Sequence, residues 1–242
     1  MNEEIERYID CHGVRLWTVA SGVGIPVIVL NGGPGCNDYL APVARLLDGQ
    51  CRVVRFEQRG CGRSDYDGHY EFETTVADIE CVRQAYEFDR VVLVGHSAGP
   101  NLALAYAIRW PSQVRGIIGI SGGKLVDDRS WSETYHRNRD TIGDQVSQEF
   151  VADPEVNRLG NETMKAYARR PELLRELAAI SCPVVFINAS DDIRPNWPTQ
   201  QLAQLIPNAS YHEIEGAQHC PWMTHADTLQ ELLLEAVGTM NG

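Results

Sequence analysis

Three short runs of mainly apolar, β-branched residues constrain the fold more than any other feature of this chain. They occupy residues 27–30, 53–56 and 91–94. Runs of this kind are typical of strands that are buried on both faces of a parallel sheet. Each run is followed by a stretch in which apolar residues recur at helical spacing. The chain is therefore predicted to build strand–helix–strand units with right-handed crossovers.

The rest of the chain extends this pattern at both ends. Residues 5–11 and 14–20 alternate apolar and polar side chains around His12 and Gly13, which predicts an antiparallel hairpin at a sheet edge. Further strands that extend the sheet are expected at residues 116–120, 184–188 and 211–214. Helices are expected at residues 39–47, 76–86, 102–108 and 228–237, the first capped by Asn37 or Asp38 and the second preceded by Thr74 and Thr75. The predicted fold is α/β, with a mostly parallel, doubly wound sheet of about eight strands.

Between Gly123 and Leu177 the alternation of strands and helices stops, and polar, helix-permissive sequence intervenes. A length of 242 residues fits one domain. We therefore expect a single domain over residues 1–242, in which residues 124–177 form a short helical lid inserted between core strands. The apolar residues of the lid either pack onto the main domain or line a pocket. They include Trp131, Tyr135, Phe150, Met164 and Tyr167, of which Trp131 and Tyr135 are the candidates for substrate binding.

The charge balance disfavours polyanionic partners. Acidic residues outnumber basic ones 33 to 21, giving a formal net charge of -12, and the Lys and Arg residues are scattered. Such a chain repels phosphate backbones and anionic lipid headgroups, so neither nucleic acid nor a membrane is an expected partner. The acidic N-terminus lacks the basic start and apolar run of a secretory signal, which predicts a cytoplasmic protein.

Seven cysteines, an odd number without paired CxxC spacing, indicate thiols rather than a disulfide framework or a zinc site. Cys36, Cys61 and Cys220 are expected near the loops discussed below, as small packing residues. No metal and no organic cofactor is expected, and the sequence leaves the oligomeric state open.

The clearest chemical motif is GxSxG, formed by residues 95–99 directly after a predicted strand and before a predicted helix. A serine on a sharp strand-to-helix turn requires small neighbours, which Gly95 and Gly99 provide, and such a turn presents the Ser97 hydroxyl above the sheet. The helix N-terminus beneath it favours developing negative charge. Ser97 is therefore the candidate nucleophile, whereas the turn directs the neighbouring His96 into a packing role.

A serine nucleophile needs a base, and the base needs an acid to orient it. His219 lies in the loop after the last predicted strand and is the candidate base, since His212 lies inside that strand and His225 begins the final helix. The acid is expected after residues 184–188, where Asp191 and Asp192 stand side by side. The NGGPG stretch at residues 31–35 is expected to form the oxyanion hole, with the N–H groups of Gly33 and Ala98 as donors.

Together these stretches resemble the α/β-hydrolase superfamily, and within it the prolyl-iminopeptidase-like branch. NGGPG is similar to that branch's HGGPG loop, FEQRGCGRS at residues 56–64 is similar to its DQRGxGxS segment, and GAQHCPW at residues 216–222 matches the base-bearing loop. In such enzymes the acid commonly ends a GxxD stretch, which maps onto residues 189–192 and selects Asp192. Asn31, Glu57 and the GHSAG elbow depart from the branch's pattern, and the lid looks shorter, so the resemblance leaves the substrate open.

The leading prediction is a serine hydrolase that cleaves a small uncharged carboxylic ester or amide through an acyl-enzyme. One alternative is a proline iminopeptidase-type aminopeptidase acting on short peptides. It would need an acidic lid residue to bind the substrate ammonium, and Glu133, Asp140, Asp144, Glu149 and Glu162 are available. The other alternative is a ligand-binding homologue that has lost turnover.

Overall fold

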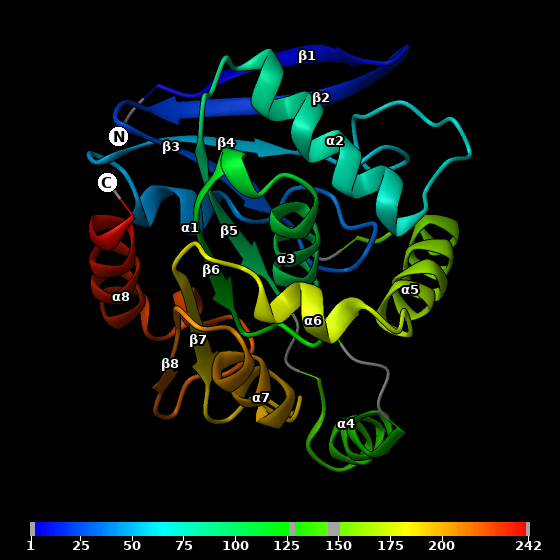
Figure 1. The fold of residues 1–242 in the computed structure, drawn as a ribbon, viewed down its shortest axis with the longest axis vertical. Coiled ribbons are helices and arrows are strands. Elements are labelled where there is room, and N and C mark those ends of the chain that lie inside the picture. The colour runs from blue at the N-terminus through cyan, green and yellow to red at the C-terminus, as the bar shows by residue number, and fades with distance from the viewer. Residues whose placement is uncertain (1–2, 126–128, 145–150, 241–242) are drawn as a thin grey trace.

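A sheet of eight strands forms the centre of the computed structural model, which describes residues 3–125, 129–144 and 151–240. The strands are β1 (Ile5–Cys11), β2 (Val14–Gly22), β3 (Ile25–Leu30), β4 (Cys51–Phe56), β5 (Val91–His96), β6 (Val114–Ile120), β7 (Val184–Ala189) and β8 (Ala209–Ile214). Their order is β1-β2-β4-β3-β5-β6-β7-β8, and only the β1–β2 and β2–β4 pairs are antiparallel (Figure 1). The predicted fold class is confirmed.

The strand order reverses direction between β3 and β5. From β3 the chain moves to β4 on one side, and it then returns to place β5 on the other side of β3. In a doubly wound sheet the loops that leave such a switch point diverge and open a crevice at the carboxyl ends of the strands. The loop after β3 and the turn after β5 therefore lie next to one another at this edge of the sheet.

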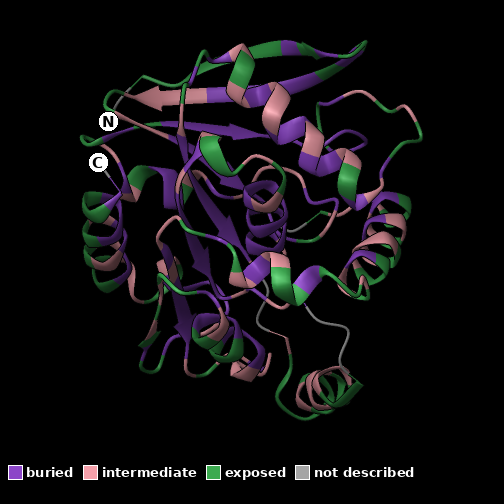
Figure 2. Ribbon diagram, in the orientation of Figure 1, coloured by how far each residue is buried: buried purple, intermediate pink, exposed green. Residues whose placement is uncertain are grey.

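Helices cover both faces of the sheet. One face carries α1 (Ala41–Leu46) and α8 (Ala226–Thr239), and the other carries α2 (Phe72–Ala85), α3 (Gly99–Arg109), α6 (Leu173–Ala178) and α7 (Trp197–Leu205). Alternation along each strand divides the core: Ile28 and Leu93 join the α2–α3 side, whereas Val27 and Val92 join the α8 side. Burying such a side chain contributes about 1.5–3 kcal/mol, and the central strands are buried almost throughout (Figure 2).

The described residues between β6 and β7 form three helices, namely α4 (Arg129–Ile142), α5 (Pro154–Ala168) and α6. Helix α5 packs against α2 through residues that include Tyr167, which contacts Phe72, whereas its buried Val156 packs with Cys61 and Tyr70. Helix α4 lies apart from the sheet at the bottom of Figure 1 and buries none of its residues. It is joined to the segment after β7 by hydrogen bonds from Trp131 Nε1 to the Pro195 carbonyl (3.0 Å) and from Asn138 Nδ2 to the Ile193 carbonyl (2.8 Å).

The predicted helix starts are wrong in several places. Helix α2 begins at Phe72, so Thr74 and Thr75 lie inside it, and the side chains of Asn37 and Asp38 do not cap α1. The amide of Phe72 donates instead to Thr163 Oγ1 of α5 (2.8 Å), a partner too distant in sequence to be read as a cap. Helix α7 was not predicted. Two short 3₁₀ helices, Pro111–Gln113 and Pro221–Met223, complete the elements of the described residues. None of the helices in the described ranges is long and apolar enough to cross a bilayer.

Candidate active site

Ser97 occupies a strained turn between β5 and α3. Its φ of +58° lies in the left-handed region that residues with a side chain rarely adopt. A Cβ on Gly95 would lie 2.4 Å from the Gly99 carbonyl carbon, and one on Gly99 would lie 2.4 Å from the Leu30 carbonyl oxygen. Only glycine fits at either position, because strand, helix and the end of β3 approach one another here. The GxSxG spacing is thus a packing requirement of this turn.

His219 and Asp192 form a buried pair. His219 Nδ1 lies 2.6 Å from Asp192 Oδ2, and the side chains are 6% and 2% exposed. The other carboxylate oxygen of Asp192 accepts hydrogen bonds from the Arg194 amide (3.0 Å) and guanidinium (3.2 Å). Burial alone would raise the pKa of Asp192, but the hydrogen bond and charge of His219 and the charge of Arg194 lower it below its ordinary value. The carboxylate is therefore ionised at neutral pH.

The other residues considered as the acid or the base are not part of this buried pair. The carboxylate of Asp191 is on the surface, where it accepts a hydrogen bond from Ser190 Oγ (2.9 Å). His225 is bonded to Thr224 through Nδ1, and His212 lies within β8. Arg194 was missed by the sequence analysis, although a cation two residues after the acid is a signal that could have found it.

His96 connects two loops of the site. Its Nε2 lies 2.9 Å from the His219 carbonyl oxygen, which can only accept, so Nε2 carries the proton. Nδ1 therefore accepts from the Tyr39 hydroxyl (2.7 Å), whose oxygen in turn accepts from the Gly32 amide (2.8 Å). Burial and the charge of His219 hold the pKa of His96 well below its ordinary value, so the ring is neutral. The role is positional, and Tyr39 is a further residue that the sequence analysis missed.

The loop after β3 passes directly over Ser97. A Cβ on Gly32 would lie 2.7 Å from Ser97 Cβ, and Gly33, with φ +122°, adopts a conformation that favours glycine. Gly33 and Ala98, the predicted oxyanion-hole residues, border the same cavity as Ser97 and Asp192. His219 is linked to this group through Asp192 and through His96, whose ring centroid lies 4.6 Å from its own.

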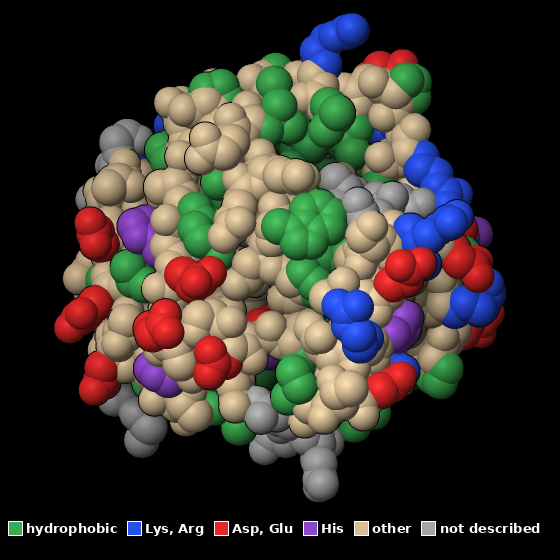
Figure 3. All heavy atoms as spheres, turned by 90° about the horizontal axis from the view of Figure 1, so that it is seen from below, with side chains coloured by type: hydrophobic (Ala, Val, Ile, Leu, Met, Phe, Trp, Pro, Cys, Tyr) green, Lys and Arg blue, Asp and Glu red, His purple; other side chains and the backbone are tan. Residues whose placement is uncertain are grey.

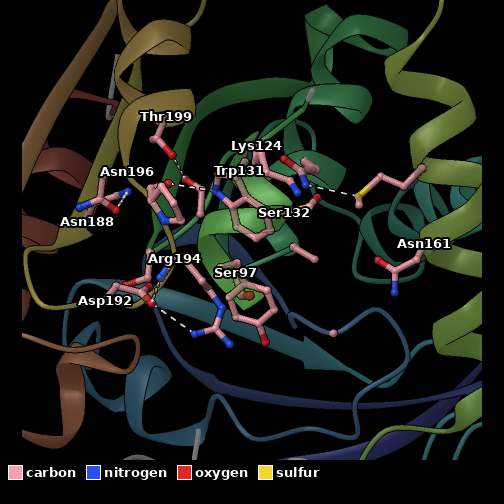
Figure 4. Close-up of a pocket in the computed structure, with 18 of the residues that line it drawn as sticks. Ser97, Lys124, Trp131, Ser132, Asn161, Asn188, Asp192, Arg194, Asn196 and Thr199 are labelled. Carbon is pink, nitrogen blue, oxygen red and sulfur yellow. Dashed lines mark hydrogen bonds and ion pairs between the residues drawn. The ribbon is translucent and has the colours of Figure 1, made fainter. Parts of the chain in front are cut away.

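The cavity has a volume of about 500 Å³ and is open to solvent. Trp131 of α4 borders it (Figure 4). Tyr135, whose ring stacks on that of Trp131 at 5.4 Å, and Met164 of α5 border it as well. Tyr167 instead packs against Phe72 in the core, with ring centroids 5.0 Å apart. Phe150 lies outside the described residues.

Polar side chains dominate the cavity wall. Among the described residues, five asparagines border it, together with three Lys or Arg side chains and a single carboxylate, that of Asp192. The asparagines are Asn101, Asn157, Asn161, Asn188 and Asn196, and the cations are Lys124, Lys165 and Arg194. Figure 3 shows the face seen from below Figure 1, where Lys and Arg side chains lie mainly on one side while acidic side chains occur on both. Among the described residues, no cluster of His, Cys, Asp or Glu is arranged to hold a metal ion.

The segment after β4 is held by hydrogen bonds within itself and to β2 and α2. Ser64 Oγ donates to the Glu57 carbonyl (2.7 Å) and accepts from the Trp17 amide (2.9 Å), and Arg59 Nε donates to Asp78 Oδ2 (2.8 Å). The cysteines of the site are free. Burial raises the pKa of Cys36 to about 11 and that of Cys220 to about 12, so both are protonated thiols.

Comparisons with known proteins identify the family of this chain. The family model described as alpha/beta hydrolase fold matches residues 25–169, which is more than half of the chain. A proline iminopeptidase from Heyndrickxia coagulans is 26% identical over an alignment covering 90% of this chain and 93% of the relative.

Solved structures share the fold. An enol-lactonase from Burkholderia xenovorans superimposes with a TM-score of 0.80 at 19% identity, covering 96% of this chain and all of the other. A proline iminopeptidase from Mycobacterium smegmatis gives a TM-score of 0.77 at 18% identity, covering 98% and 99%. At such identities these structures establish the fold alone. The matching family model shows that the chain belongs to the α/β-hydrolase family, and the proline iminopeptidase relative places it in the proline-iminopeptidase-like branch.

Proposed function

We propose that this hydrolase cleaves a small uncharged carboxylic ester or amide through an acyl-enzyme, with Ser97 as nucleophile, His219 as general base and Asp192 as the orienting acid. The observation that carries the proposal is the buried 2.6 Å contact between His219 Nδ1 and Asp192 Oδ2 beside the turn that bears Ser97. An ionised carboxylate bonded to Nδ1 keeps the proton on that nitrogen, which leaves Nε2 able to accept one.

In the first step, Ser97 Oγ forms a bond to the carbonyl carbon while His219 Nε2 takes the hydroxyl proton. The N–H groups of Gly33 and Ala98 donate to the oxygen as it becomes negative, in a place where such donors stabilise the transition state most. The bond to the alcohol or amine then breaks, and His219 returns its proton to that leaving group. Asp192 stabilises the imidazolium in between.

In the second step, water attacks the acyl-enzyme while His219 takes one of its protons. The bond between Ser97 Oγ and the acyl carbon breaks, and the proton passes from His219 to Ser97. The carboxylic acid is released and the enzyme is restored. The chemistry needs no redox partner.

A proline iminopeptidase-type aminopeptidase is the second candidate, favoured by the full-length relative described above. The cavity gives it less support. Three of the candidate lid carboxylates form ion pairs: Asp144 with Arg194, Asp140 with Arg139, and Glu162 with Arg158. None of these three carboxylates borders the cavity, and Glu133 does not border it either. Glu149 lies outside the described residues. Turnover of a prolyl anilide that exceeds turnover of a phenyl acetate would select the peptidase.

Active-site labelling and paired variants test the proposal. A fluorophosphonate probe is expected to modify the folded protein at Ser97, and Ser97→Ala is expected to lower kcat for ester hydrolysis at least about 10³-fold.

Asp192→Asn is expected to lower kcat about 10⁴-fold because the imidazole takes the wrong tautomer. The matched control is Asp191→Asn, which alters an exposed carboxylate one residue away and should retain activity. A folded protein that resists labelling would instead support a non-catalytic homologue.

A further inference from the structure

Three of the residues that surround the cavity contain buried polar atoms without a partner. Asn101 Oδ1, Ser121 Oγ and Asn188 Oδ1 form no hydrogen bond with any described residue. The described residues contain five buried side-chain nitrogen or oxygen atoms without a partner, and these are three of them. Buried polar groups in folded proteins are almost always hydrogen-bonded, to protein, water or ligand. All three residues border one cavity, so a ligand that reaches these atoms from the cavity would pair with them.

Ser121 and Asn188 lie in a row with Ser97. The Ser97 amide donates to the Ile120 carbonyl (2.9 Å), and the Ser121 amide donates to the Ile187 carbonyl (2.9 Å). The three residues thus follow one another across the carboxyl ends of β5, β6 and β7. Ser121, like Ser97, has a positive φ, at +46°. A backbone strained in this way persists where the surrounding structure holds it, often at a functional site.

The orientation of the Asn188 amide follows from its neighbour. Asn196 Nδ2 donates to the Ala189 carbonyl (3.0 Å) and to the Glu213 carboxylate (3.2 Å), groups that can only accept. The oxygen of Asn196 therefore faces Asn188, whose Nδ2 donates to it at 2.9 Å (Figure 4). This leaves Asn188 Oδ1 as an acceptor, and only a donor can satisfy it.

We propose that Ser121 and Asn188 form a polar subsite beside Ser97 that selects substrates carrying a hydroxyl or amide N–H group near the scissile carbonyl. The proposal rests on the hydrolase function proposed above. An acceptor oxygen and a hydroxyl at adjacent strand ends match an O–H or N–H group, which donates to Asn188 and exchanges a hydrogen bond with Ser121. A purely alkyl substrate leaves both atoms unpaired, and sites of this kind reject such analogues strongly.

Two isosteric substrate pairs test this subsite, one for each side of the scissile bond. The acyl pair is phenyl 3-hydroxybutanoate and phenyl 3-methylbutanoate, and the alcohol pair is 2-hydroxyethyl acetate and propyl acetate. After correction for hydroxide-catalysed hydrolysis, kcat/KM is expected to favour the hydroxylated member at least about tenfold in one pair. Equal values in both pairs would overturn the proposal.

Two variants assign the preference to these residues. Asn188→Leu and Ser121→Ala are each expected to lower kcat/KM at least about tenfold for the preferred hydroxylated ester, and about twofold or less for its alkyl partner. Asn208→Leu, an exposed asparagine away from the cavity, is the matched control. Equal losses on both members of a pair would indicate a structural role and contradict the subsite.

A binding measurement separates this proposal from the proposed hydrolysis. The Ser97→Ala variant is titrated with the same four esters, and the rise in its melting temperature is measured. A larger rise with a hydroxylated ester, abolished by adding Asn188→Leu, would support the subsite even if the wild-type protein hydrolysed none of them. Turnover of the esters with no such difference in binding or rate would reject the subsite and leave the hydrolase function intact.

Discussion

His96 is the residue whose protonation couples the site most directly to folding. It is fully buried and neutral, and its two ring nitrogens join Tyr39 to the His219 carbonyl. Protonation would place a second donor opposite the Tyr39 hydroxyl and a charge in the core. The folded state therefore disfavours the imidazolium, whereas the unfolded chain does not.

We predict that this depressed pKa makes stability fall as the pH is lowered below about 6.5. In that window the unfolded state binds a proton at His96 and the folded state does not, so the free energy of unfolding decreases by up to about 1.4 kcal/mol per pH unit from this residue. The loss continues until the pH reaches the folded-state pKa. Urea unfolding of the wild type and His96→Gln at pH 5, 6, 7 and 8 measures the slope.

The variant is expected to be less stable at pH 8, because it loses hydrogen bonds, but to lose less stability on acidification. His225→Gln, at the start of α8, serves as the control and should keep the wild-type slope. If His96→Gln and the wild type show parallel curves, His96 is not the group that titrates.

At the scale of single residues, the sequence predicts a site residue where the local backbone geometry requires a particular residue type. Ser97 and His219 could be singled out because each follows a predicted strand, and Gly95 and Gly99 mark the turn. Arg194 and Tyr39 escaped notice, because their roles depend on contacts with Asp192 and His96 that only the folded chain creates. Asp192 was separable from Asp191 through the family resemblance alone, since adjacent loop carboxylates have no local signal for direction.

At the scale of elements, α5 supports the loop that follows β3. Asn157 Nδ2 donates to the Pro34 carbonyl (2.8 Å), and the Asp153 amide donates to the Gly35 carbonyl (3.1 Å). The contact is close as well as polar, because a Cβ on Gly160 would lie 2.8 Å from Pro34 Cβ. Helix α5 thereby limits where Gly33, one residue before Pro34, can lie.

We predict opposite effects for the same substitution in two helices. Gly238→Ala in α8, with nothing within 4 Å of the new Cβ, should raise the free energy of unfolding by about 0.5–1 kcal/mol through helix propensity. Gly160→Ala should lower it by about 1–3 kcal/mol, because α5 and Pro34 must separate. Urea unfolding measures both. Gly160→Ala should also lower kcat/KM, whereas Gly238→Ala should leave kcat/KM unchanged. Equal stabilisation by both substitutions would show that α5 does not pack tightly against the loop after β3.

Elements were predictable from sequence where they are buried, and less so elsewhere. The core strands form continuous apolar runs, and each was found. Helix α7 was missed because its sequence, WPTQQLAQL, carries few apolar residues, of which Leu202 and Ala203 are buried. The start of α2 was missed because α5, rather than a neighbouring side chain, satisfies its first amide.

At the scale of the molecule, the two largest hydrophobic clusters lie on opposite faces of one sheet. Leu104 of α3 belongs to one cluster and Leu229 of α8 to the other, and both are fully buried. Every central strand contributes residues to both. We propose that residues 1–242 therefore form a single domain, with residues 124–177 as a lid inserted into it. Loss of packing on either face should weaken the whole sheet.

We predict that Leu104→Ala and Leu229→Ala each lower the free energy of unfolding by about 2–5 kcal/mol and shift the entire transition. Urea unfolding followed by tryptophan fluorescence and by far-ultraviolet circular dichroism should give coincident curves for each variant. Leu174→Ala, at a residue 60% exposed, is the control and should change stability by about 0.5 kcal/mol or less. If the probes separate in one variant, the face bearing that leucine unfolds independently, and the sheet does not couple the two halves of the core.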